Sequence, residues 1–175
     1  MIENKSEIFV VIFIIAIIAG SGFLYSQTYE KDTVGIFPDK LGDMNMTSYK
    51  GGYAAINDIK ELHGGLPRRI ENGYVVDYTG NSSSKAKFWV TESANNKDAI
   101  AIVNAMNKVV WTAGTYSNST SMNIEGIDVY FVSGLMGHGM YHYFYAKDNK
   151  IFWVQIDNPE ELYRINFLKE SIERI

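Results

Sequence analysis

Apolar and polar positions change their spacing several times along the chain, and each spacing predicts one kind of element. The stretch from Ile8 to Tyr25 is apolar and carries no charged residue. At about 1.5 Å per helical residue it reaches about 27 Å, close to the thickness of a hydrocarbon core. Charged residues flank the stretch on both sides, so it predicts a single transmembrane anchor with Tyr25 at one interface. A cleaved export signal with its apolar core at residues 8–19 is the alternative, and both interpretations export the rest of the chain.

The anchor divides the chain into four predicted segments. Residues 1–7 form a short cytoplasmic N-terminus and residues 8–25 the anchor. Residues 26–49 are polar and turn-rich, which is typical of a tether. Residues 50–175 are numerous enough for one extracytoplasmic domain with its own core. The sequence therefore predicts a single-pass protein of the cell membrane with the bulk of the chain outside the cytoplasm.

Helical spacing of apolar residues recurs three times in this domain. The first helix is predicted at residues 50–63. The second begins after Asn95, where Asp98 stands at the spacing of a capping box. The third begins at residues 158–161, with Asn158 as the expected cap and a proline in the first turn. Its apolar stripe is predicted to consist of Leu162, Ile165, Leu168, Ile172 and Ile175.

Between the helices, short runs rich in aromatic and β-branched residues predict five strands, at residues 73–79, 85–92, 127–132, 140–145 and 151–156. The sequences Phe88-Trp89-Val90 and Phe152-Trp153-Val154 each close a hairpin shortly before a helix. This repetition predicts two degenerate strand–strand–helix units, with an extra strand in the second. The predicted fold class is α+β, with two layers formed by an antiparallel sheet of about five strands and helices on one of its faces.

The side chains of a strand alternate between two faces, so the sequence also predicts which residues share a face. The purely apolar positions belong under the helices, which leaves Trp89 and Trp153 on the opposite face. If Asp148-Asn149 forms a two-residue turn, this face gains two cross-strand pairs, Phe144 with Trp153 and His142 with Gln155. A register shift of one residue would exchange the sets and turn the tyrosines of residues 141–145 outward.

An uncovered sheet face of this kind is rich in aromatic side chains, which protein interfaces use more than other surfaces do. The predicted partner-binding residues are Trp89, Trp153, Phe144, His142 and Gln155. In the alternative interpretation, the tether or the polar loop of residues 112–123 folds over the face and makes it ordinary core.

A second function class rests on the alternation of methionine and histidine through residues 136–142. Such donors suit copper, and the imidazoles also suit zinc, so the predicted metal ligands are His138, Met140 and His142. Residues two apart on a strand are about 6.6–7 Å apart, so the two histidines reach one ion only if the chain bends between them. In the alternative, the methionines pack and the histidines form hydrogen bonds, and no cofactor is bound.

The amino-acid composition excludes several further kinds of site and partner. The chain has no cysteine, which excludes disulfides and thiolate metal sites. Its net charge is −4 and its basic residues are scattered, so nucleic acid is not an expected partner. Three glycosylation sequons follow the anchor, at Asn45, Asn81 and Asn118, and agree with a location outside the cytoplasm.

No motif places a base beside a nucleophile or cradles a phosphate. The sequence therefore predicts a non-enzymatic, membrane-anchored domain that binds a partner protein through the aromatic face. It acts either as an accessory subunit of a membrane assembly or as a domain that associates with itself. A copper- or zinc-binding ectodomain is the alternative.

Overall fold

The computed structural model describes residues 36–63, 70–80, 84–112, 114–135 and 140–175. Phe37–Ile175 is one compact unit. Its elements are β1 (Lys40–Leu41), β2 (Met44–Gly51), α2 (Gly52–His63), β3 (Ile70–Gly80), β4 (Lys85–Ser93), α3 (Asn96–Val109), β5 (Thr120–Ile124), β6 (Ile127–Ser133), β7 (Tyr141–Lys147), β8 (Lys150–Asp157) and α4 (Glu161–Arg174). The predicted anchor lies outside the described residues. None of the helices found within them is long and apolar enough to cross a bilayer.

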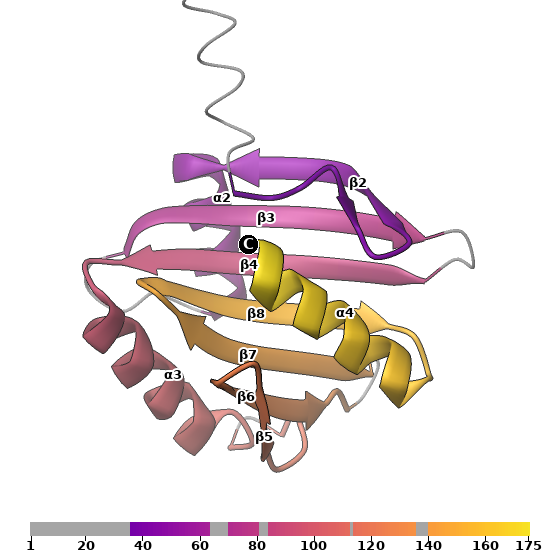
Figure 1. Ribbon diagram of the computed structural model, residues 1–175. Helices are drawn as coiled ribbons and strands as arrows, with labels where there is room; N and C mark the ends of the chain where they lie inside the picture. The colour runs from indigo at the N-terminus through magenta and orange to yellow at the C-terminus, as the bar shows by residue number, and fades with distance from the viewer. Residues whose placement is uncertain (1–35, 64–69, 81–83, 113, 136–139) are drawn as a thin grey trace, which may run out of the picture. The chain divides into compact units, whose positions relative to one another are not determined.

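The described strands form one antiparallel sheet of eight, in the order β1-β2-β3-β4-β8-β7-β6-β5 (Figure 1). Two meanders, β1–β4 and β5–β8, meet where β4 pairs with β8. The α+β class and the antiparallel sheet are confirmed, whereas the predicted number of about five strands is wrong. The missed strands are β1, β2 and β5, and β1 with most of β2 belongs to the segment predicted as a tether.

The two Phe-Trp-Val sequences lie against each other at the centre of the sheet. Trp89 of β4 stands opposite Trp153 of β8. In the β7–β8 hairpin, Lys147 pairs with Lys150 around the predicted two-residue turn, and Asp148 takes a positive φ of 53° there. Phe144 therefore stands opposite Trp153 and His142 opposite Gln155, as the sequence predicted.

The sheet is covered by helices on both faces. We call the face that carries Trp89 and Trp153 the tryptophan face, and the opposite face, which carries Tyr143 and Tyr145, the tyrosine face. Figure 1 shows α4 in front of the sheet and α2 behind it.

Each helix is assigned to its face by its packing. On the tryptophan face, α2 packs through Ala55 and Ile59 against Trp89, and α3 packs through Ala99 and Val103 in a cluster with Phe144. On the tyrosine face, α4 packs through Phe167 onto Tyr78 and Phe88, with ring centroids 6.5 and 6.0 Å apart.

The prediction of a two-layer domain with helices on one face is therefore wrong. The central strands carry large apolar side chains on both faces, so each face requires its own cover. The helices that follow the two Phe-Trp-Val strands lie on opposite faces, so the predicted strand–strand–helix unit does not repeat as a whole.

The ends of the helices agree only in part with their predicted caps. The Asn95 side chain accepts a hydrogen bond from the backbone N–H of Asp98 at 2.9 Å, which confirms the cap of α3. The cap position of α4 is Glu160, and Asn158 accepts from the backbone N–H of Glu160 at 2.8 Å, so the predicted cap lies two residues too early. Leu162, predicted to be in the apolar stripe, is 72% exposed. The buried residues of α4 are Arg164, Phe167, Leu168, Ser171 and Ile172.

Candidate functional site on the tryptophan face

Phe144, one of the predicted partner-binding residues, lies in the core under α3. Its side chain is fully buried, and its ring stacks between those of Tyr130 and Trp153 with both centroid distances at 5.2 Å. Ala99 and Val103 of α3 close the same cluster. The expectation of an uncovered face is therefore wrong at this position, because a helix covers it.

His142 is also buried, with 3% of its surface exposed. Trp153 donates a hydrogen bond from Nε1 to His142 Nδ1 at 3.1 Å. Tyr116 meets both rings edge-on, at centroid distances of 5.0 Å from His142 and 5.3 Å from Trp153. Burial raises the pKa of Tyr116 above its ordinary value. Since Tyr116 belongs to the loop of residues 112–123, the alternative that this loop covers the face is confirmed here.

This packing also bears on the predicted metal site. The Trp153 N–H occupies the lone pair of His142 Nδ1, whereas the Met140 side chain is 60% exposed. His138, the third predicted ligand, lies outside the described residues. In the described part of the chain, no three His, Asp or Glu side chains gather around a point that an ion could occupy. A copper or zinc site that includes His138 stays a prediction from the sequence.

The other predicted partner-binding residues, Trp89, Trp153 and Gln155, are half-buried. Trp89 packs on one side against Ala55 and Ile59 of α2. The ammonium group of Lys87 lies 5.3 Å from the centre of a Trp89 ring, within the range of a cation–π interaction. The tryptophan face thus changes from apolar under α3 to polar beside Trp89.

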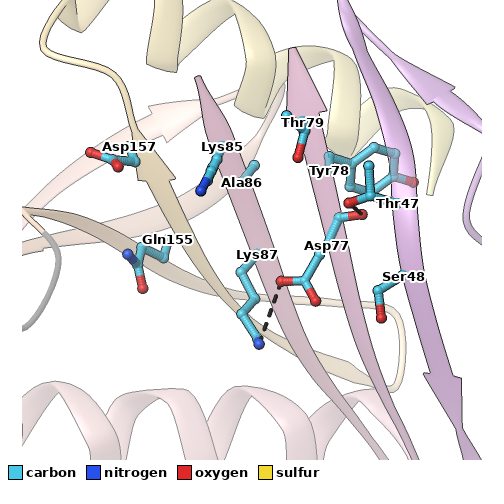
Figure 2. A pocket seen from close by; sticks show the side chains of 10 residues that line it. All are labelled: Thr47, Ser48, Asp77, Tyr78, Thr79, Lys85, Ala86, Lys87, Gln155 and Asp157. Carbon is cyan, nitrogen blue, oxygen red and sulfur yellow. Dashed lines mark hydrogen bonds and ion pairs between the residues drawn. The ribbon is translucent and has the colours of Figure 1, made fainter. Parts of the chain in front are cut away.

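A pocket of about 360 Å³ occupies this polar part of the sheet, and strands supply its walls (Figure 2). Its lining residues are Thr47, Ser48, Asp77, Tyr78, Thr79, Lys85, Ala86, Lys87, Gln155 and Asp157. Lys87 forms an ion pair with Asp77 at 3.4 Å, and Lys85 stands opposite Asp157 in the β4–β8 register. Basic side chains of β4 are therefore flanked by acidic side chains of β3 and β8.

Only Gln155 of the pocket was among the residues predicted to bind a partner. The alternation of side chains contained a usable signal for one other lining residue, since Lys87 lies two residues from Trp89 on β4 and therefore on the same face. Asp77 stands opposite Lys87 in the β3–β4 hairpin. This pairing could be predicted only with the register of the two strands, which the long loop between them leaves open.

No protein-family model, curated protein or solved structure matches this chain. Function resides in sites rather than in folds, so we infer it from the residues of the tryptophan face. The pocket offers ammonium donors, carboxylate acceptors and the amide of Gln155 within one opening. Such a set can pair with groups of either charge and with backbone amides.

Proposed function

We propose that this chain is a membrane-anchored extracytoplasmic domain that binds a partner protein and performs no catalysis of its own. The partner docks on the polar part of the tryptophan face, at the pocket that Gln155 lines. The half-buried Trp89 and Trp153 form the next pair of residues on the same face of β4 and β8. The observation that carries the proposal is this pocket of about 360 Å³, with the partly exposed Asp77–Lys87 ion pair in its wall.

The chemistry of the pocket favours a protein segment as its occupant. Neighbouring strands present opposite charges, Asp77 beside Lys87 and Lys85 opposite Asp157. A complementary partner presents side chains of both signs at matching spacing, and complementary charge of this kind gives register and specificity. Tryptophan beside such a polar rim adds large contact area, as in the central residues of protein interfaces.

The membrane anchor rests on the sequence of residues 8–25 and has a test of its own. The full chain is expected to stay in the membrane pellet after a carbonate wash, because an apolar helix of this length partitions into the bilayer. Replacing Ile14 and Ile15 by arginine places two charges in the centre of the helix, each disfavoured by about 2.5–3.5 kcal/mol, and should release the chain. Mass spectrometry of the N-terminus distinguishes the anchor from a cleaved signal. An intact wild-type chain in the cytosol would contradict the proposal.

Partner binding is tested by exchanging the charges of the ion pair. The double variant Asp77→Lys with Lys87→Asp keeps opposite charges together but reverses which strand carries each of them. We expect this exchange to weaken partner binding at least about tenfold, a change of about 1.4 kcal/mol. The domain should remain stable, because ion pairs this exposed contribute about 0–1 kcal/mol.

The partner itself is identified by photo-cross-linking in intact cells, with the reactive side chain placed at Gln155. A matched position is Glu173, which is exposed on α4 at the opposite face of the sheet. A discrete adduct from Gln155 alone, lost in the charge-exchanged variant, supports the proposal. Equal adducts from both positions, or an adduct that survives the charge exchange, would contradict docking at the pocket.

A further inference from the structure

The two edges of the sheet differ in how they are protected against pairing with another strand. On the β2 edge, the short β1 covers Met44 and Asn45, and Met46 donates its backbone N–H to Asp39 at 2.8 Å. A bulge interrupts β2 between Met46 and Ser48, and Lys50 adds a charge near its end. Bulges, charges and short covering strands are the usual protections of sheet edges.

Within the part of the chain that the structure describes, the β5 edge has no bulge, no charged residue and no covering strand. The strand consists of Thr120, Ser121, Met122, Asn123 and Ile124, without charge or proline, and pairs with β6 without a bulge. Thr120, Ser121 and Asn123 are exposed to solvent. Among the described residues, β5 ends the order of strands, so its outer side faces no further strand of the sheet.

The turn that joins β5 to β6 fixes which backbone groups face outward. Ile124 pairs with Ile127 around Glu125 and Gly126, whose φ values of 49° and 80° are those of a two-residue hairpin turn. The residues that flank such a turn form a hydrogen-bonded pair, and bonded pairs alternate along antiparallel strands. Met122 and Ile124 therefore bond toward β6, whereas the N–H and C=O groups of Ser121 and Asn123 point away from the sheet.

We propose that β5 pairs in antiparallel fashion with β5 of a second copy of this chain, which joins two sheets edge to edge. With the two-fold axis at Met122, Ser121 of each copy stands opposite Asn123 of the other, and their outward groups form the new hydrogen bonds. The strand suits self-pairing because it carries no charged residue, so the pairing opposes no like charges within the strand.

The contrast between the edges also limits the size of the assembly. Pairing of β5 with β2 of a neighbour would be heterologous and would produce a ring or an open fibre, but the bulge and the covering β1 obstruct it. Self-pairing uses the same edge on both copies and closes after two. This surface is distinct from the pocket on the tryptophan face and does not rest on the function proposed for that pocket.

The first test uses the full chain in detergent, with its mass measured over a range of concentrations. We expect a dimer whose dissociation constant rises at least about tenfold in Ser121→Pro. This substitution removes an outward N–H, and proline is tolerated on an edge strand where the N–H faces solvent. Ser121→Ala keeps the N–H and should dimerise like the wild type. A monomer throughout, or a dimer unchanged by Ser121→Pro, would overturn the proposal.

A second test does not depend on the proline variant folding. Because the chain has no cysteine, Met122→Cys places one thiol on the two-fold axis, where directly opposed residues lie close enough for a disulfide. We expect Met122→Cys to form disulfide-linked dimers under mild oxidation faster than Ser48→Cys, which places the thiol on the β2 edge. Equal rates for the two variants would overturn the β5 pairing even if the chain dimerises by another surface.

Discussion

Replacing Phe144 by alanine is expected to lower the free energy of unfolding by about 3–5 kcal/mol, the usual cost of removing a buried phenylalanine. The ring is fully buried and stacks on Trp153 at an interplanar angle of 10°, with Tyr130 on its other side. Its removal opens a cavity between the sheet and α3, which the helix can fill only in part. Urea unfolding of the full chain in detergent, followed by tryptophan fluorescence, measures the loss.

The matched control is Tyr53→Ala, which removes an aromatic ring from α2. Tyr53 is 74% exposed, so its loss should change stability by no more than about 0.5 kcal/mol. A cost below about 1 kcal/mol for Phe144→Ala would mean that Phe144 lies in an open surface after all. That result would restore the whole aromatic face, as first predicted from the sequence, as the region where a partner docks.

The central part of the sheet could be predicted from the sequence because its turn and its alternation agree. Asp148-Asn149 is a strong two-residue turn, and once it is fixed, the pairs Phe144–Trp153 and His142–Gln155 follow from counting. Alternation along β4 and β8 then places both tryptophans on one face. The turn type and the alternation of side chains depend only on residues close together in the sequence, so both could be read from it.

The number of layers could not be predicted in this way. Alternation tells which residues share a face, but not which face a following helix covers. Phe144 and Phe88 are both fully buried although they lie on opposite faces of the sheet. Two apolar faces are compatible with helices on one side plus a docking surface, or with helices on both sides. Only the path of the chain after β4 and β8 distinguishes these arrangements.

The missed strands have a different cause. β2 and β5 are edge strands that are largely exposed, so their sequences show little apolar alternation. Their pairing is supplied by β3 and β6, which is a long-range contribution that local propensity does not contain. The polar composition that hid β5 from prediction is also what suits it to pair with a copy of itself.

Arg164 is a buried residue of α4 that the apolar pattern of the helix did not predict. It lay outside the predicted stripe of α4, yet only 5% of its surface is exposed. Its Nε donates to the Tyr143 hydroxyl at 2.8 Å, and its Nη1 donates to the backbone carbonyls of Asn158 and Pro159 at 2.8 and 2.7 Å. The guanidinium also lies 3.7 Å from the centre of the Tyr141 ring. Arg164 thus ties the start of α4 to β7.

Arg164→Ala is expected to destabilise the domain by about 2–4 kcal/mol, because it leaves the hydroxyl of Tyr143 and two carbonyls without their donor. Arg164→Lys keeps the charge but lacks the planar, forked donor and should recover less than half of this loss. A double-mutant cycle of Arg164→Ala with Tyr143→Phe isolates the bond between them, and we expect a coupling of about 0.5–3 kcal/mol. Additive effects in the cycle, or a stable Arg164→Ala variant, would show that α4 is held by Phe167, Leu168 and Ile172 alone. The burial of Arg164 on the tyrosine face would then contribute nothing measurable to stability.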